Sequence, residues 1–168
     1  YRTASNLKMI HLQNAYVGNY ALASPKANVR TYEDFARQGQ DFAEAARNAA
    51  AQMKGKVVAI SDVGGNREFF NTILKLGGLT TKDFKLEIVS DTKIVQLAKA
   101  GRIDFAFPQG AAQSVELMDL GFRRVLGFGH FVEGLPKGDE RVVRGIGHAG
   151  LQAPEDYVRE NRETVLRF

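Results

Sequence analysis

Between residues 55 and 128 the pattern of apolar and polar positions changes its period several times. Short apolar runs rich in β-branched and aromatic residues predict buried strands, whereas apolar residues spaced three and four apart predict helices. The expected strands are residues 56–60, 84–89, 103–107 and 124–128. The expected helices between them are residues 66–76, 92–100 and 111–120. This alternation predicts an α/β fold with a mostly parallel sheet flanked by helices.

The segments on either side of this region are less regular. Residues 1–31 predict two short strands with an irregular joint between them. A long helix is expected at residues 32–53, with Gly39 as the point that weakens or divides it. A loop rich in glycine, proline and charge is expected from residue 129, and a last helix from Pro154.

The composition narrows the class of protein. A chain of 168 residues has the length of one domain, and 44% apolar with 25% charged residues is ordinary for a globular protein. No apolar run approaches the roughly 18 residues that a membrane span needs. No basic start followed by an apolar stretch occurs, so we expect an intracellular protein or a chain that follows a removed N-terminal part. The lack of cysteine excludes disulfides, thiolate metal sites and cysteine nucleophiles.

The charge changes the picture only slightly. Lys and Arg number 23 against 19 Asp and Glu, a formal net charge of +4 that is spread along the chain without a basic block. Because neither a basic stripe nor an aromatic RNA motif is present, nucleic acid is not an expected partner. The small excess favours anionic solutes.

The first candidate site follows the strand at residues 56–60. In open α/β sheets, ligands bind beyond the carboxyl ends of the strands, and a helix that begins there attracts anions with its first N–H groups. The candidate ligands in this turn are Ser61, Gly64, Gly65 and Asn66. Arg67 adds a partner for a carboxylate or sulfonate, whereas Asp62 opposes an anion unless it turns away. A plain glycine turn with Asn66 as the helix cap explains the same residues, so both interpretations stay open.

The second candidate is Gln109, which follows the strand at residues 103–107 at the same edge of the sheet. Its carboxamide offers two donors and an acceptor to a polar solute, although a simple turn explains it equally well. Asp91 also follows a strand, but the capping of the next helix explains it better.

Histidine and the known catalytic motifs give no sign of an enzyme. The three histidines, His11, His130 and His148, are far apart and lack metal-ligand spacing. His130 follows a strand end, where it either lines a cleft or is a satisfied core residue. No nucleophile elbow, phosphate-binding loop or dinucleotide fingerprint occurs. We therefore predict no catalytic residue, no metal and no cofactor.

Two segments carry a resemblance to a known family. They read GKVVAISDVGGNREFFNTILKLGGLTTKDFKLEIV and QLAKAGRIDFAFPQGAAQSVELMDLGFRRVLGF. They resemble the second lobe of the type II periplasmic solute-binding proteins of ABC transporters, in the nitrate, sulfonate and taurine group. The family elements lie at residues 55–58, 64–66, 76–83 and 101–106. The closing APEDYVRENRETVLRF is similar to the family's terminal helices, and the resemblance covers residues 8–168. The family's first βαβ units, expected before Tyr1, are absent.

The resemblance implies one lobe of the type II periplasmic-binding-protein fold. Residues 1–54 would be crossover strands and a long helix, and residues 55–128 the α/β ligand-binding lobe. Residues 129–168 would be a return segment and C-terminal helices toward the first lobe. Asn19, placed by the resemblance at a crossover between lobes, becomes a further candidate ligand.

The function that the resemblance implies is that of the solute-binding component of an ABC-type importer. It would bind a small anionic or polar organic solute in a cleft between lobes and present it to a permease in the membrane. The expected location is periplasmic or extracellular, with the signal segment outside this chain.

Two other functions remain open on the same fold. One is an enzyme of the decarboxylase, desulfinase or pyrimidine-precursor synthase type, with a histidine as the acting group. The other is the ligand-sensing effector domain of a transcription regulator, which requires a DNA-binding helix-turn-helix elsewhere in the protein.

Overall fold

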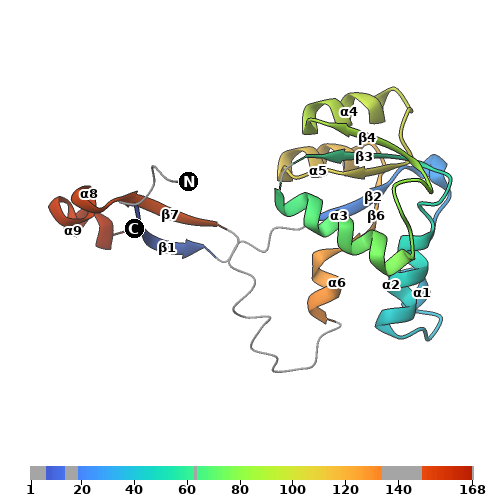
Figure 1. Ribbon diagram of the computed structural model, residues 1–168, viewed down its shortest axis with the longest axis horizontal. Helices are drawn as coiled ribbons and strands as arrows, with labels where there is room; N and C mark the ends of the chain where they lie inside the picture. The colour runs from blue at the N-terminus through green and yellow to red at the C-terminus, as the bar shows by residue number, and fades with distance from the viewer. Residues whose placement is uncertain (1–6, 14–18, 63, 134–148, 168) are drawn as a thin grey trace. The chain divides into compact units, whose positions relative to one another are not determined.

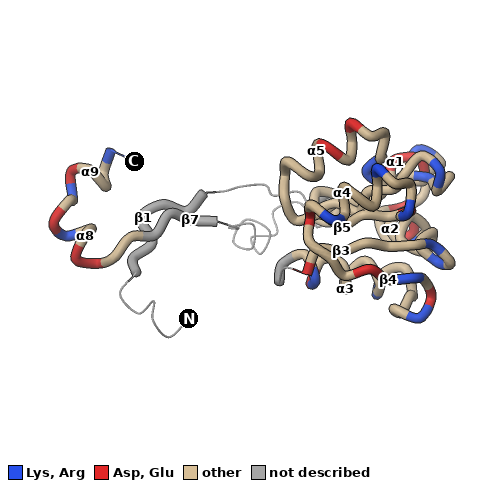
Figure 2. The backbone as a smooth tube through the Cα atoms, turned by 90° about the horizontal axis from the view of Figure 1, so that it is seen from above, with Lys and Arg blue, Asp and Glu red and all other residues tan. Residues whose placement is uncertain are grey.

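The computed structural model describes residues 7–13, 19–62, 64–133 and 149–167 (Figure 1). The chain forms two compact units. The smaller comprises Tyr1–Val17 with Pro136–Phe168, and the larger comprises Gly18–Leu135. Basic and acidic positions are interspersed in both units (Figure 2), as the spread of charge along the sequence predicts.

The larger unit is built on a five-stranded sheet with the order β4-β3-β5-β2-β6. Its strands are β2 (Tyr20–Ala23), β3 (Val57–Ser61), β4 (Lys85–Val89), β5 (Phe105–Phe107) and β6 (Arg123–Gly127). Strand β3 pairs in parallel with β4 and β5, and β2 pairs antiparallel with both β5 and β6. Four strands therefore run in one direction and β2 runs against them, which confirms the predicted mostly parallel α/β sheet.

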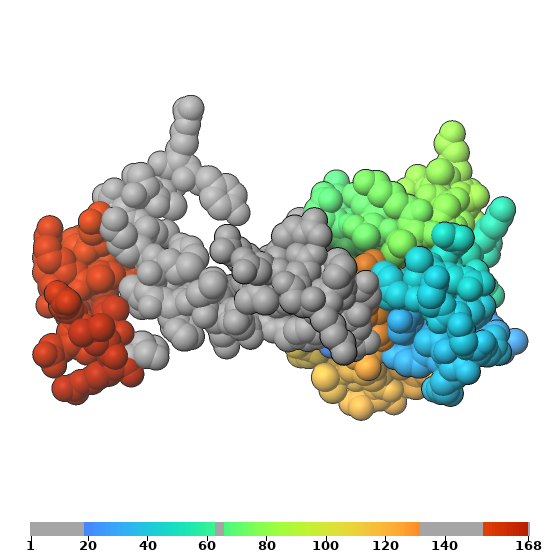
Figure 3. Space-filling model, turned by 90° about the horizontal axis from the view of Figure 1, so that it is seen from below, coloured from blue at the N-terminus to red at the C-terminus, as the bar shows by residue number. Residues whose placement is uncertain are grey.

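Helices cover both faces of this sheet. They are α1 (Tyr32–Ala36), α2 (Phe42–Ala51), α3 (Gly64–Gly77), α4 (Asp91–Lys99), α5 (Ala111–Asp119) and α6 (Phe128–Glu133). A short 3-10 helix at Pro25–Ala27 follows β2. Helices α1, α2 and α3 pack beside one another on one face, and α4 and α5 pack together on the other. In the space-filling view the cyan residues of α1 and α2 lie next to the green residues of α3 (Figure 3).

Alternate strand residues supply the two halves of the core. Val58 and Ile60 pack with residues of α1, α2 and α3, and Ala59 packs with residues of α4 and α5. Phe105 and Phe107 contribute to the first cluster and Ala106 to the second, and all three are fully buried. Burial on both faces explains why these strands are continuously apolar in sequence, as predicted.

The long helix expected at residues 32–53 is two helices. Thr31 caps α1 through a capping box with Asp34, and Asp41 caps α2. Between them Gly39 has φ +85°, in the left-handed region that glycine adopts readily. The single helix was wrong, and its division at Gly39 is confirmed. The loop expected from residue 129 was also wrong in its first part, because α6 extends to Glu133.

The smaller unit contains a two-stranded antiparallel sheet and two short helices. Strand β1 (Leu7–Gln13) pairs with β7 (Ala149–Pro154), with an irregularity between Met9 and His11. Helix α8 (Glu155–Glu160) begins directly after Pro154, where the last helix was predicted to start, and α9 (Arg162–Leu166) follows. His148 lies outside the described residues. No helix in the described part of the chain has the length and apolarity to cross a membrane.

Candidate functional site

The predicted site residues converge on one edge of the sheet in the larger unit. Ser61 ends β3 opposite Val89 of β4, and the loop that carries Gln109 follows β5, whose last residue pairs with Ile60. Because β2 runs the other way, it begins at this same edge. Asn19 precedes it, and its carbonyl accepts a hydrogen bond from the Phe128 N–H at 3.1 Å. We call this line of loops the carboxyl edge.

Asn66 holds two strands together at the carboxyl edge. Its side-chain amide donates to the carbonyl oxygens of Ser61, at 3.0 Å, and Phe107, at 2.7 Å. The residue is completely buried and lies inside α3, which begins at Gly64, so it is not the cap of this helix. Both amide hydrogens are used inside the protein. Asn66 therefore has no donor left for a solute, and its role is to fix the start of α3 against β3 and β5.

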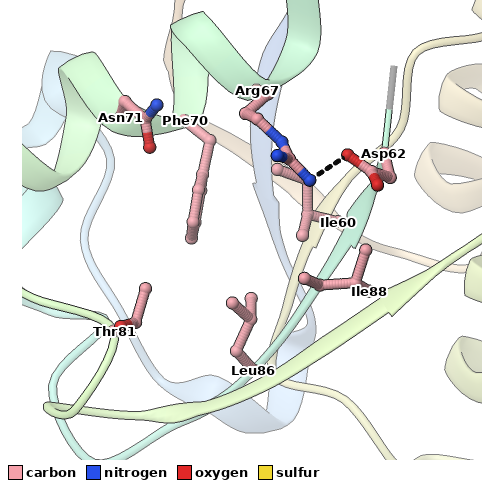
Figure 4. Close-up of a pocket in the computed structure, with 8 residues that line it drawn as sticks. All are labelled: Ile60, Asp62, Arg67, Phe70, Asn71, Thr81, Leu86 and Ile88. Atoms are coloured by element: carbon pink, nitrogen blue, oxygen red, sulfur yellow. Dashed lines mark hydrogen bonds and ion pairs between the residues drawn. The ribbon is translucent and has the colours of Figure 1, made fainter. Parts of the chain in front are cut away.

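Asp62 and Arg67 satisfy each other at the start of α3. A guanidinium nitrogen of Arg67 donates to Oδ1 of Asp62, and about half of each side chain is exposed (Figure 4). An exposed pair of this kind contributes little to stability. The pair matters more for anion binding. Arg67 neutralises the Asp62 carboxylate, which would otherwise repel an anion, and Asp62 in turn occupies the Arg67 guanidinium, which could otherwise bind an anion.

Two hollows meet beside this ion pair. One, of about 530 Å³, lies at the ends of β3 and β4 and is lined by Ser61, Asp62, Ile88, Val89, Ser90 and Asp91. The other, of about 280 Å³, has Ile60, Phe70, Leu86 and Ile88 as apolar walls and polar residues at its rim (Figure 4). Asp62 and Ile88 line both, so the hollow at the carboxyl edge adjoins the groove between α3 and β4.

Asp91 does not cap α4 as predicted. The cap is Ser90, whose Oγ accepts from the Lys93 N–H at 3.4 Å, and Asp91 is the first residue of the helix. The Asp91 carboxylate instead accepts from the backbone N–H groups of Gln109, at 2.9 Å, and Gly110, at 3.0 Å. The local sequence misses this contact, because an Asp before a helical pattern is typical of a cap and the partners lie 18 and 19 residues away.

His130 is a satisfied core residue. Its Nδ1 accepts from the Gly127 N–H at 3.1 Å, so its Nε2–H is the group that donates to Oε1 of Glu33, also at 3.1 Å. The ring stacks on Tyr32 with a centroid distance of 4.4 Å and is 8% exposed. Both ring nitrogens are used, which leaves neither for chemistry on a solute.

The surroundings of Glu33 lower the pKa of its carboxyl group. Partial burial raises the pKa of Glu33, but hydrogen bonds from its own backbone N–H and the Thr31 hydroxyl, together with the His130 ring, outweigh that effect. The pKa of Glu33 therefore lies below its ordinary value of 4.5. Among the described residues, no group of three or more His, Asp or Glu side chains could hold a metal ion.

This sheet and its flanking helices have the fold of the type II periplasmic solute-binding proteins, over about half the length of those proteins. The periplasmic sulfonate-binding protein SsuA of Methylobacillus flagellatus KT, described as putative, matches 96% of this chain and 40% of its own, at 18% identity and a TM-score of 0.56.

Two further solved structures agree. The alkanesulfonate-binding protein SsuA of Xanthomonas axonopodis pv. citri, bound to MOPS, matches 94% of this chain and 44% of its own, at 15% identity and a TM-score of 0.53. The aliphatic sulphonate-binding protein SsuA of Escherichia coli matches 98% and 54%, at 13% identity and a TM-score of 0.52. No protein-family model and no curated protein matches the sequence. At sequence identities of 13–18%, the similarity to these structures shows the fold alone.

Proposed function

We propose that this chain is part of a solute-binding protein and binds a small anionic or polar organic solute at the carboxyl edge of its larger unit. The observation that carries the proposal is the convergence of Ser61, Gln109, Asn19 and the start of α3 on that edge. This is where open α/β sheets bind ligands.

The start of α3 is the element best suited to an anion. The first N–H groups of a helix have no partner within the helix and carry a partial positive charge. Gly64 and Gly65 supply this backbone without side chains that would block it. Asp62 is neutralised by Arg67, and Asn66 fixes the helix start, so an anion can approach. Ser61, Gln109 and Asn19 would add hydrogen bonds.

The wider role follows the proteins of the same fold. We infer an ABC-type importer component that works in the periplasm or outside the cell. A second lobe would close over the solute, and a permease would recognise the closed state. The solved structures are of sulfonate-binding proteins, one of them bound to MOPS, which makes sulfonates the first class to test. The internal contacts of His130 argue against an enzyme that uses His130 as its acting group.

The test is thermal unfolding and calorimetric titration of the full chain with sulfonates, nitrate, carboxylates, amino acids and pyrimidine precursors. We expect one anionic class to raise the unfolding temperature in proportion to its concentration and to bind saturably. Gln109→Ala should weaken that binding several-fold. Gln96→Ala, an exposed glutamine on α4, is the matched control and should not. Equal affinity in the two variants, or no response to any class, would overturn the proposal.

A further inference from the structure

The loop that leads into α5 is bound to a carboxylate of the protein itself. Gly110 is the N-cap of this nine-residue helix and has no side chain to cap it. The two consecutive N–H groups just before the helix, of Gln109 and Gly110, donate to the two oxygens of Asp91. Two N–H groups on one carboxylate at a helix start are the arrangement in which proteins bind anions. Asp91 thus takes the place of a bound anion.

Glycine at position 110 leaves room for the Asp91 carboxylate beside the backbone. A Cβ there would lie 3.2 Å from Oδ2 of Asp91, a tight contact, and 2.0 Å from Oε1 of Gln113, whose flexible side chain would have to move. The φ of Gly110 is −78°, which any residue adopts, so a larger residue would press on the carboxylate without straining the backbone.

The contact joins two loops of the candidate site. Asp91 follows β4 and lines the hollow at the carboxyl edge, while Gln109 follows β5. Within the described residues, Oε1 of Gln109 is buried and has no hydrogen-bond partner. The position of this carboxamide therefore depends on its backbone, and Asp91 holds the Gln109 N–H and the next N–H along the chain, that of Gly110, by one hydrogen bond each.

We propose that Asp91 is a positioning residue for solute binding, an internal anion that fixes Gln109 at the carboxyl edge without touching the solute. The inference rests on the proposed function. It makes a second claim that needs no solute: once the Asp91 carboxylate is removed, the two N–H groups bind a free small carboxylate such as formate.

The experiment is the Asp91→Ala variant of the full chain, measured with and without excess sodium formate. Without formate, we expect the dissociation constant of the solute found in the panel to rise about tenfold, as for other residues that orient ligands. Formate should restore most of that loss and should raise the unfolding temperature of the variant, while leaving wild type unchanged. Sodium chloride at equal ionic strength controls for screening.

Asp83→Ala is the matched control. The Asp83 carboxylate also accepts from a backbone N–H, that of Thr80 at 2.7 Å, and from the Thr80 hydroxyl at 2.9 Å. It lies before β4, at the end of that strand opposite to Asp91. This variant should lose stability but keep its affinity for the solute, and formate should not affect it.

The outcomes separate the two proposals. If formate stabilises Asp91→Ala but wild type binds no solute, the internal anion stands and the proposed function fails. If wild type binds a solute and Asp91→Ala binds it equally well, the positioning role is refuted. If formate stabilises Asp91→Ala no more than Asp83→Ala, the internal anion is refuted. Should Asp91→Ala not fold, Asp91→Asn replaces it: its amide keeps one acceptor and fills the site, so affinity should fall without rescue by formate.

Discussion

Removal of the Asn66 side chain tests the bridge between β3 and β5. Asn66→Ala deletes two hydrogen bonds, each worth about 1 kcal/mol net, and leaves the carbonyls of Ser61 and Phe107 without this donor. The substitution also removes the buried Oδ1 of Asn66, which has no hydrogen-bond partner within the described residues, and this partly offsets the loss of stability. We expect a net destabilisation of about 2 kcal/mol, or a fall of about 4–8 °C in the unfolding temperature.

The assay is urea unfolding followed by far-UV circular dichroism, compared with Asn71→Ala. Asn71 is an exposed asparagine on the same helix, so it controls for helix propensity and for the loss of an amide. Asn66→Ala should lower the urea midpoint at an unchanged slope, and Asn71→Ala should stay within about 0.5 kcal/mol of wild type. A loss in Asn66→Ala no larger than that in the control would refute the bridge.

Asn66→Asp sharpens the same test through its pH dependence. The carboxylate would face two carbonyl oxygens in a buried site, so its pKa in the folded protein should rise above that in the unfolded chain. The folded protein then binds more protons, and stability should fall as pH rises through the range between the two pKa values. The dipole of α3 opposes this by up to about 2 kcal/mol. A stability that is independent of pH relative to wild type would contradict the proposed geometry.

Three further predictions test other parts of the larger unit. Asp62→Asn should free Arg67 and lower the dissociation constant for an anion about two- to fivefold, and Arg67→Ala should raise that constant. Calorimetric titration should show that both changes become smaller at high salt. An unchanged dissociation constant in both variants would refute the role of the ion pair. Because the pKa of Glu33 is lowered on folding, its carboxylate stabilises the protein above pH 4.5 and loses this effect as pH falls below that value. Urea titrations should therefore show that Glu33→Gln is less stable than wild type near neutral pH and that this difference becomes smaller in acid. A difference in stability that persists in acid would show that the Glu33 carboxylate is not its cause. Gly39→Ala should lower the free energy of unfolding by about 1–2 kcal/mol, because position 39 has a left-handed backbone conformation. Gly39→Asn should lower it less, and an equal loss of stability in the two variants would contradict this explanation.

The sequence predicts the parallel part of the sheet well, and it predicts a short strand before residue 31, but not the reversed direction of β2 or its place in the sheet. Strands β3 and β5 could be predicted because their continuous apolar runs are typical of burial on both faces. Strand β4 lies at the edge of the sheet and has no fully buried residue, yet its position between two helical patterns still predicts a strand. Strand β2 has only four residues, and nothing local indicates that it lies between β5 and β6 in the opposite direction. Its place is set by pairing with residues 82 to 107 positions later, which a local pattern does not encode.

The position of the candidate site could also be predicted from the sequence, whereas the contacts of its residues could not. The edge of the sheet could be predicted, because strand direction fixes where the loops after β3 and β5 meet. The roles of Asn66 and Asp91 could not, since each was explained as a helix cap by its neighbours in sequence. Asn66 reaches Phe107, 41 residues away, and Asp91 reaches Gln109, 18 residues away. Helix α6 was missed for a related reason: it is six residues long, and the contact of His130 with Glu33 joins it to α1.

These contacts share a physical consequence for binding. Asn66 joins β3 to β5, Asp91 joins the loops after β4 and β5, and the Asn19 carbonyl joins the start of β2 to α6. Each is a polar bond to backbone, so the loops at the carboxyl edge are held before any solute arrives. A loop that is already ordered loses little conformational entropy on binding, and affinity then depends on the fit of the solute to fixed groups. Variants of Asp91 and Asn66 that break these contacts should therefore weaken binding even where the altered side chain touches no solute.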